Sequence, residues 1–225
     1  MKAEGKHALE ETVRWNDGVG WIAYPDERME RSSTALAVDD DVWVIDPVDA
    51  PELDDLLAAY GEVAGVVVCL DRHYRDVETV ALRHDVPVYA PTWMSGVEAE
   101  ITEAPVERFG GELADTGIEV IRVRDSAIPS WQEVALYREA DGTLVVPEAV
   151  GAGEFFCVGD ERLGVHPMLR PFPPRRALGS LAPERVLTGH GGGVDEDATA
   201  ALRDALAGSR KRAPRLYLKL VGLFV

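Results

Sequence analysis

The chain has 225 residues, with 40 acidic and 23 basic side chains and a formal net charge of −17. This length fits one large domain or two small ones and is enough to bury a substantial core. Nucleic-acid binding is disfavoured, because phosphate neutralisation needs clustered Lys or Arg, and the basic residues outside the C-terminal run are interspersed with acids. No apolar run approaches the length of a membrane span.

The dispersed negative charge predicts a halophilic, haloarchaeal-like protein, because acidic surfaces stay hydrated when salt screens their charge. The N-terminal residues 1–6 lead into a polar segment, so we expect no signal peptide. Cys69 and Cys157 lie in separate apolar stretches, and buried free thiols fit this pattern better than a disulfide between strands. Together these features predict a cytoplasmic protein.

The first half of the chain predicts a regular succession of elements. A hairpin, a helix, a buried strand, a second helix and a short strand are expected at 36–47, 51–60, 66–70, up to about 84, and 86–91. The hairpin alternates apolar residues around an acidic turn, and the helices carry apolar residues at helical spacing.

A polar turn at 71–76 follows the buried strand and offers Asp71, His73 and Asp76 as candidate site residues. Carboxylates and imidazoles are metal ligands, so these three side chains could serve one oxygen-rich site. The alternative is that the two carboxylates cap the following helix and pair with neighbouring arginines, which leaves His73 as a solvated turn residue.

The second half, from about 117 to 193, again shows strands followed by helix, after a less regular segment at 92–115. In that segment Trp93 and Met94 either line a pocket or pack inside, and we favour packing. His166 precedes a proline and could face a cleft, although a packing or surface role comes first.

Near the C-terminus, an apolar strand at 185–188 leads into His190, which stands between glycines. Glycine tolerates any backbone conformation, so this histidine can be aimed into a cleft, and imidazole is the commonest metal ligand. The alternative is an exposed turn histidine. The last residues, about 209–225, are basic and apolar, and we expect them to dock on their own domain rather than to lie on an anionic membrane.

Taken together, these motifs resemble the metallo-β-lactamase fold superfamily from about Thr34 to about Leu206. They read Val44-Ile45-Asp46-Pro47, Val86-Pro87-Val88-Tyr89-Ala90-Pro91 and Val186-Leu187-Thr188-Gly189-His190-Gly191. The resemblance implies an α/β protein with an αββα sandwich. We expect one domain over residues 1–225 that ends in the basic tail.

The hydrolases of that superfamily carry HxHxDH after the buried strand and hold two metal ions there, whereas this chain offers only Asp71, His73 and Asp76. The stretch 125–131, where the resemblance implies a further histidine, has none. Glu148 stands in the place of the bridging aspartate, with Asp160 as a second candidate.

The resemblance therefore implies His73, Asp76, Glu148 and His190 as metal ligands, and Asp71 and His190 as catalytic residues, with Asp71 as the base for a bound water. Two functions remain open. One is a non-catalytic or weakly metal-binding relative with a degenerate site, holding no metal or one Zn, Mn or Fe ion. The other is a mononuclear metal-dependent hydrolase of a small ester, thioester or phosphoester.

Overall fold

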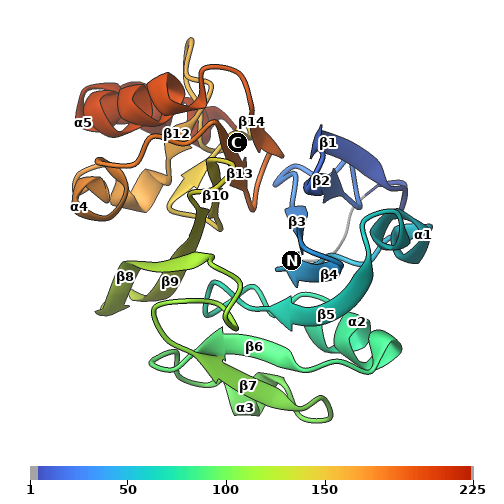
Figure 1. The fold of residues 1–225 in the computed structure, drawn as a ribbon. Coiled ribbons are helices and arrows are strands. Elements are labelled where there is room, and N and C mark those ends of the chain that lie inside the picture. The colour runs from blue at the N-terminus through green and yellow to red at the C-terminus, as the bar shows by residue number, and fades with distance from the viewer. Residues whose placement is uncertain (1–4, 224–225) are drawn as a thin grey trace.

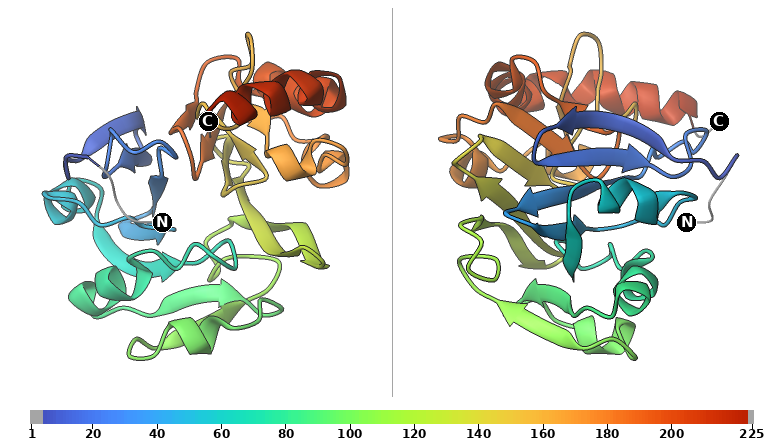
Figure 2. Two further views of the ribbon diagram at one scale, coloured as in Figure 1. Left: turned by 180° about the vertical axis from the view of Figure 1, so that it is seen from behind. Right: turned by 45° about the vertical axis from the view of Figure 1, so that its right-hand side comes forward.

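The structure is a computed structural model and describes residues 5–223. Two β-sheets pack face to face, and helices cover the outer side of each sheet (Figure 1). The view from behind shows the same four layers, with the long C-terminal helix on the outer side of the second sheet (Figure 2). The αββα sandwich expected from the sequence is therefore confirmed.

The first sheet contains seven strands in chain order. They are β1 (Glu10–Trp15), β2 (Gly18–Ile22), β3 (Ser32–Val38), β4 (Asp41–Ile45), β5 (Glu62–Val67), β6 (Val88–Pro91) and β7 (Val106–Phe109). Strands β1 to β4 are antiparallel, and β4 to β7 pair in parallel. Parallel neighbours need crossover connections, which here contain α1 (Leu53–Ala58), α2 (Val77–His84) and α3 (Val97–Glu100).

The second sheet has the strand order β14-β13-β10-β9-β8. Its strands are β8 (Glu119–Ala127), β9 (Ser130–Arg138), β10 (Thr143–Val146), β13 (Arg185–Thr188) and β14 (Gly193–Val194). A two-stranded sheet, a 3₁₀ turn and two helices complete the chain: β11 (Val150–Gly151), β12 (Gly164–Val165), η1 (Pro167–Leu169), α4 (Arg175–Leu178) and α5 (Ala198–Leu223). Strands β10 and β13 are parallel, so their C-terminal ends lie at the same end of the sheet.

Three apolar layers hold the sandwich together. The layer between the sheets contains Leu36, Ile45 and Leu187, all almost fully buried. One outer layer packs α1 and α2 on the first sheet, and the other packs α5 on the second sheet. Burial of apolar surface is the main driving force for such layers, and the alternation along the strands supplies both faces of each sheet.

The predicted hairpin at 36–47 is confirmed by β3 and β4. The buried strand predicted at 66–70 differs, because β5 already ends at Val67. The chain then crosses toward the second sheet, where Leu70 forms a bridge with Glu133. This crossing places the polar turn 71–76 between the two sheets.

The segment 92–115 is more regular than expected, since it contains α3 and β7. Met94 is buried in the core beneath the first sheet, and the half-buried ring of Trp93 carries the Arg122 guanidinium at 4.2 Å from its centroid. Both thiols are free, with Cys69 buried and Cys157 half-buried. No helix in the described part of the chain is long and apolar enough to cross a bilayer.

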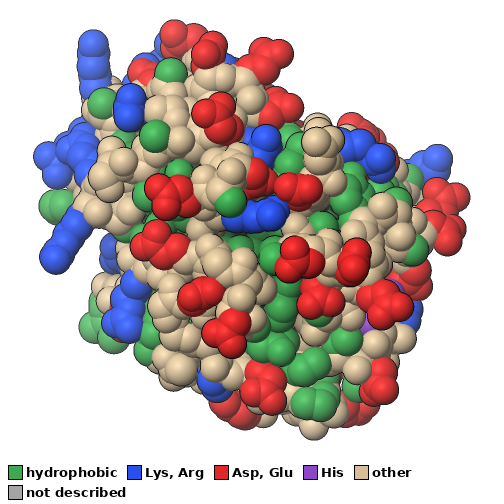
Figure 3. Space-filling view, in the orientation of Figure 1, with side chains coloured by type: hydrophobic (Ala, Val, Ile, Leu, Met, Phe, Trp, Pro, Cys, Tyr) green, Lys and Arg blue, Asp and Glu red, His purple; other side chains and the backbone are tan. Residues whose placement is uncertain are grey.

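Acidic side chains are scattered over the face seen in Figure 3, whereas basic side chains gather at its upper left, over α4 and α5. The C-terminal part of α5 packs on its own domain through the buried Ala213 and Leu216. In addition, the Tyr217 hydroxyl donates to the Pro167 carbonyl oxygen over 2.9 Å.

Candidate metal centre

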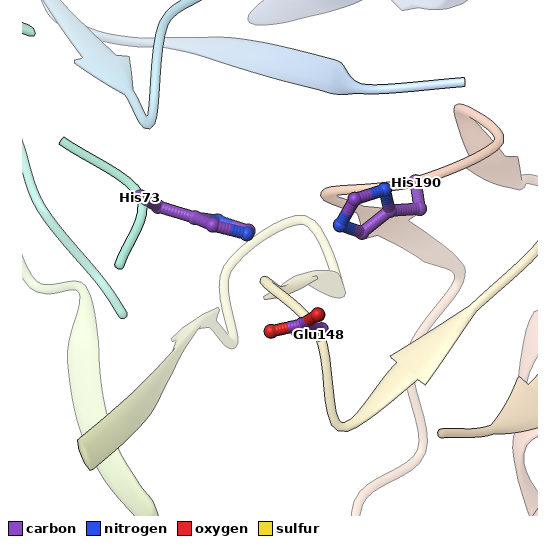
Figure 4. A group of neighbouring side chains, drawn as sticks. All are labelled: His73, Glu148 and His190. Atoms are coloured by element: carbon purple, nitrogen blue, oxygen red, sulfur yellow. The ribbon is translucent and has the colours of Figure 1, made fainter. Parts of the chain in front are cut away.

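Three turns meet at one end of the sandwich and bring His73, Glu148 and His190 together (Figure 4). His73 follows β5, Glu148 follows β10, and His190 follows β13. One ligand atom from each of the three lies within 4.8 Å of the others. The two imidazoles point toward one another, and the carboxylate approaches the space between them (Figure 4).

The glycines beside His190 are required by close packing. A β-carbon on Gly189 would collide with the carbonyl oxygen of Pro147, and one on Gly191 would collide with the backbone of Gly153. Gly191 also has a φ of +82°, which favours glycine. The chain can therefore reverse sharply between β13 and β14 and hold the imidazole inside.

The imidazole of His190 is 2% exposed. Its Nδ1 lies 2.8 Å from the carbonyl oxygen of Met29. Since a carbonyl can only accept, Nδ1 carries the proton and Nε2 offers a lone pair to the site. Nε2 is buried and has no hydrogen-bond partner among residues 5–223. Burial, followed by the charge of Arg75, holds the pKa of His190 well below its usual range, so the ring is neutral.

His73 is oriented by a buried carboxylate. Its Nδ1 lies 3.0 Å from Oδ2 of Asp46, which directly follows β4, and Oδ1 of Asp46 accepts from the Cys69 amide over 2.9 Å. Burial raises the pKa of Asp46 to about 7, against the lowering effect of Arg75. Burial likewise holds the pKa of His73 well below its usual range. A carboxylate behind an imidazole is the usual means of fixing a metal ligand.

Glu148 is held by its backbone and by its side chain. The amides of Glu148 and Ala149 both donate to Oε1 of the buried Glu133 over 2.8 Å. The Glu148 carboxylate accepts from Nε of Arg72 at 2.8 Å and lies 3.7 Å from Nε2 of His166. Burial raises the pKa of Glu148, and Arg72 opposes that shift. Glu133 was not predicted from the sequence, where nothing marks it apart from other acids.

Solved structures with a similar fold include a metallo-β-lactamase from Pontibacter korlensis, with a TM-score of 0.60 at 14% identity over 88% of this chain and 99% of that one. The chain has the metallo-β-lactamase fold. A diflavin flavoprotein fragment from Nostoc sp. gives 0.63 at 14% identity over 92% and 98%. The chemotaxis sensor ODP from T. denticola gives 0.58 at 10% over 89% and 93%.

No protein-family model and no curated protein matches the chain. A lactamase, a flavoprotein and a sensor thus share the metallo-β-lactamase fold with this protein at low sequence identity. Because one fold hosts different activities, function has to be argued from the site.

Within the metallo-β-lactamase fold, the other predicted site residues lie outside the group of three. The Asp71 carboxylate accepts from the Gln132 amide at 2.9 Å and from Arg72 at 2.8 Å. Oδ2 of Asp76 accepts from the Asp49 amide at 2.9 Å, and Asp76 also lines the cavity beside the group. The second candidate, Asp160, is exposed in the loop after β11.

His166 is buried against the rings of Trp131 and Phe156 and also approaches Glu148. Its Nδ1 accepts from the Met168 amide at 3.2 Å, so Nε2 carries the proton that faces the Glu148 carboxylate. Burial, and then the charge of Arg72, lowers the pKa of His166 to about 3. His166 therefore packs in the interior, as expected, and also lies beside the candidate site.

A cavity of about 370 Å³ adjoins the group and is lined by Arg31, Arg72 and Arg75 as well as by Asp76 and the three candidate ligands. Arg75 donates to the carbonyl oxygens of Ser32, Asp46 and Gly189 over 2.6 to 3.0 Å. Its Nη2 also lies 3.4 Å from Nε2 of His73. Arg75 thus ties together the ends of β3, β4 and β13.

Proposed function

We propose that the protein binds one divalent metal ion through His73, Glu148 and His190 and acts as a metal-dependent hydrolase of a small ester, thioester or phosphoester. The observation that carries the proposal is the orphaned Nε2 of His190, a buried lone pair directed at a second imidazole and a carboxylate. Two histidines and one glutamate form a donor set of catalytic zinc sites, which keep one position for water.

A bound ion would supply Lewis-acid activation of water and of the substrate oxygen. The chain's own residues prepare the site for it. Asp46 and the carbonyl of Met29 hold the two imidazoles with Nε2 directed inward. Both rings are neutral, so no proton has to leave them on binding. The adjoining cavity of about 370 Å³ is of the size that takes small molecules.

A second candidate is a non-catalytic relative with weak metal binding, and Arg75 favours it. Aligned without a gap, residues 71–76 set His73 on the second histidine of HxHxDH and Arg75 on its aspartate. A guanidinium therefore stands where a ligand is expected, 3.4 Å from Nε2 of His73. Its charge, together with that of Arg72 on Glu148, lowers the affinity for a cation. Only three ligands remain, which rules out a stable dinuclear centre in this proposal.

Calorimetric titration of EDTA-treated protein with Zn²⁺, Mn²⁺ and Fe²⁺ tests the metal site. We expect one ion per chain for at least one of these metals. At a free metal concentration of 100 times Kd, binding adds about 2.7 kcal/mol of stability, which raises Tm by roughly 5 to 10 °C. His190→Ala should remove both effects. His84→Ala is the control, because His84 pairs with Asp54 on a helix end outside the site.

Hydrolysis is then screened with chromogenic esters, thioesters and phosphoesters, with and without the metal that binds. Metal-dependent turnover that is lost in His190→Ala and kept in His84→Ala supports the hydrolase. Saturable metal binding without turnover on any substrate class selects the non-catalytic relative. Absence of metal binding, or binding that survives His190→Ala unchanged, contradicts the proposed centre.

A further inference from the structure

The cavity beside the candidate metal centre has a charge opposite to that of the protein. Three arginines and two acidic residues, Asp76 and Glu148, line it, whereas the whole chain carries −17. Arginines gathered in a recess attract small anions, because the surrounding protein screens charge less than bulk water does. The cavity therefore favours an anionic occupant.

Two of the three arginines that line the cavity keep donors that no described residue uses. Nε of Arg31 donates to both oxygens of Glu27 at 2.8 Å. Arg72 donates through Nε to Glu148 and through Nη1 to Asp71. Both terminal nitrogens of Arg31 and Nη2 of Arg72 have no hydrogen-bond partner in the described part of the chain.

The third arginine contributes charge rather than free donors. The terminal nitrogens of Arg75 donate to backbone carbonyls and lie beside His73. Its buried Nε has no hydrogen-bond partner within residues 5–223. No carboxylate among these residues forms an ion pair with it. Asp46, Glu148 and Glu27 act on it only electrostatically, so its charge adds to the attraction for an anion in the cavity.

The arginine pair is also held in place. The Arg72 guanidinium lies over the ring of Trp131, 4.2 Å from the centroid, and Arg31 lies 5.9 Å from the ring centroid of Tyr24. Planar guanidinium groups that are already oriented lose little freedom when they bind an oxyanion, and they match carboxylate and phosphate geometry.

We propose that this cavity is an oxyanion-binding subsite in which Arg31 and Arg72 hold the carboxylate or phosphate group of a small substrate, next to His73, Glu148 and His190. This inference rests on the proposed function and narrows it, since it selects anionic esters, thioesters or phosphoesters over neutral ones. The subsite itself is a property of the metal-free protein and can be measured there.

The test is calorimetric titration of EDTA-treated protein with inorganic phosphate and, separately, with succinate. We expect saturable binding of at least one of the two, and the stronger one identifies the type of oxyanion. Arg72→Gln should weaken that binding at least tenfold. Arg210→Gln is the control, because Arg210 is an exposed arginine on α5 that donates to Pro171, and its binding should equal that of the parent protein.

Arg72→Gln should change metal affinity and oxyanion affinity in different directions. Arg72→Gln removes the donor that occupies the Glu148 carboxylate, so Zn²⁺ binding should stay equal or tighten while oxyanion binding falls. A variant that is merely misfolded would lose both. Arg31→Lys keeps a charge beside the buried Glu27 and should weaken oxyanion binding less than Arg72→Gln.

Failure of this inference is distinct from failure of the metal centre. If Zn²⁺ binds and neither phosphate nor succinate does, or if Arg72→Gln and Arg210→Gln bind oxyanion equally, the subsite is refuted and the metal centre stands. If oxyanions bind as described and no metal does, the subsite stands and the hydrolase is refuted.

Discussion

A fully buried ion pair gives the most quantitative prediction about this protein. Arg170 and Glu161 have no exposed side-chain surface, and two parallel contacts of 2.7 and 3.1 Å join them. Arg170 also donates to the carbonyl oxygens of Val165 and Phe156. The pair thus fixes the loop that carries His166 against the candidate metal centre.

Replacing Arg170 with Met leaves the Glu161 carboxylate buried, with Arg212 as the remaining cation at 3.6 Å. Breaking a buried pair by removing one partner costs about 3 to 5 kcal/mol. That is a large part of the total stability of a domain, about 5 to 15 kcal/mol. The double variant Arg170→Met/Glu161→Gln removes the stranded charge and keeps an acceptor for the Val158 amide, so it should recover at least about 1 kcal/mol.

Urea unfolding followed by far-UV circular dichroism measures these differences. The control is Arg14→Met, because Arg14 is 53% exposed in its pair with Glu11 and should change stability by less than about 0.5 kcal/mol. Salt should not reduce the effect of Arg170→Met, since buried pairs are poorly screened. A cost equal to that of the control, or a double variant no more stable than the single one, would refute the reasoning.

Three further predictions concern the surface, the site turn and the titration of the core. Raising KCl from about 0.1 M to about 1 M, where the Debye length falls to about 3 Å, should raise Tm by screening the repulsion among the acidic side chains of this −17 chain. A flat response would contradict the prediction of a halophilic protein. Gly191→Ala should cost more stability in urea than Gly117→Ala: both have positive φ, at +82° and +74°, but only the β-carbon at Gly191 meets other atoms, so equal costs would exclude the steric argument. The pKa of His166 falls to about 3 on folding, so its neutral ring costs no stability above pH 6.5, but stability is lost as the pH falls because the unfolded chain binds a proton there. Between pH 7 and pH 5 the free energy of unfolding of the metal-free protein should fall by about 2 kcal/mol more than that of His166→Phe, and parallel pH profiles would disprove this.

Local sequence patterns predicted single elements, and the resemblance to a known superfamily implied the sandwich and the candidate ligand His190. Alternating apolar residues around an acidic turn predicted the β3–β4 hairpin, which is confirmed. The glycines around His190 predicted a sharp turn that could aim its ring into a cleft or leave it exposed. The structure shows His190 buried, and a β-carbon at Gly189 or Gly191 would collide with backbone. Such features depend on backbone sterics and on short-range periodicity, and both can be read from neighbouring residues.

Only the tertiary structure decided which polar side chain of the turn joins the group of three candidate ligands. His73, Asp71 and Asp76 are neighbours in sequence, but the two carboxylates accept from amides 61 and 27 positions away, whereas His73 is turned inward by Asp46. The same holds for Arg31, which directly precedes β3, and for Glu133 on β9, which both reach the candidate site. A polar side chain in a turn points to the hydrogen-bond partner that folding brings to it, and that partner is fixed by long-range packing, which local sequence does not encode.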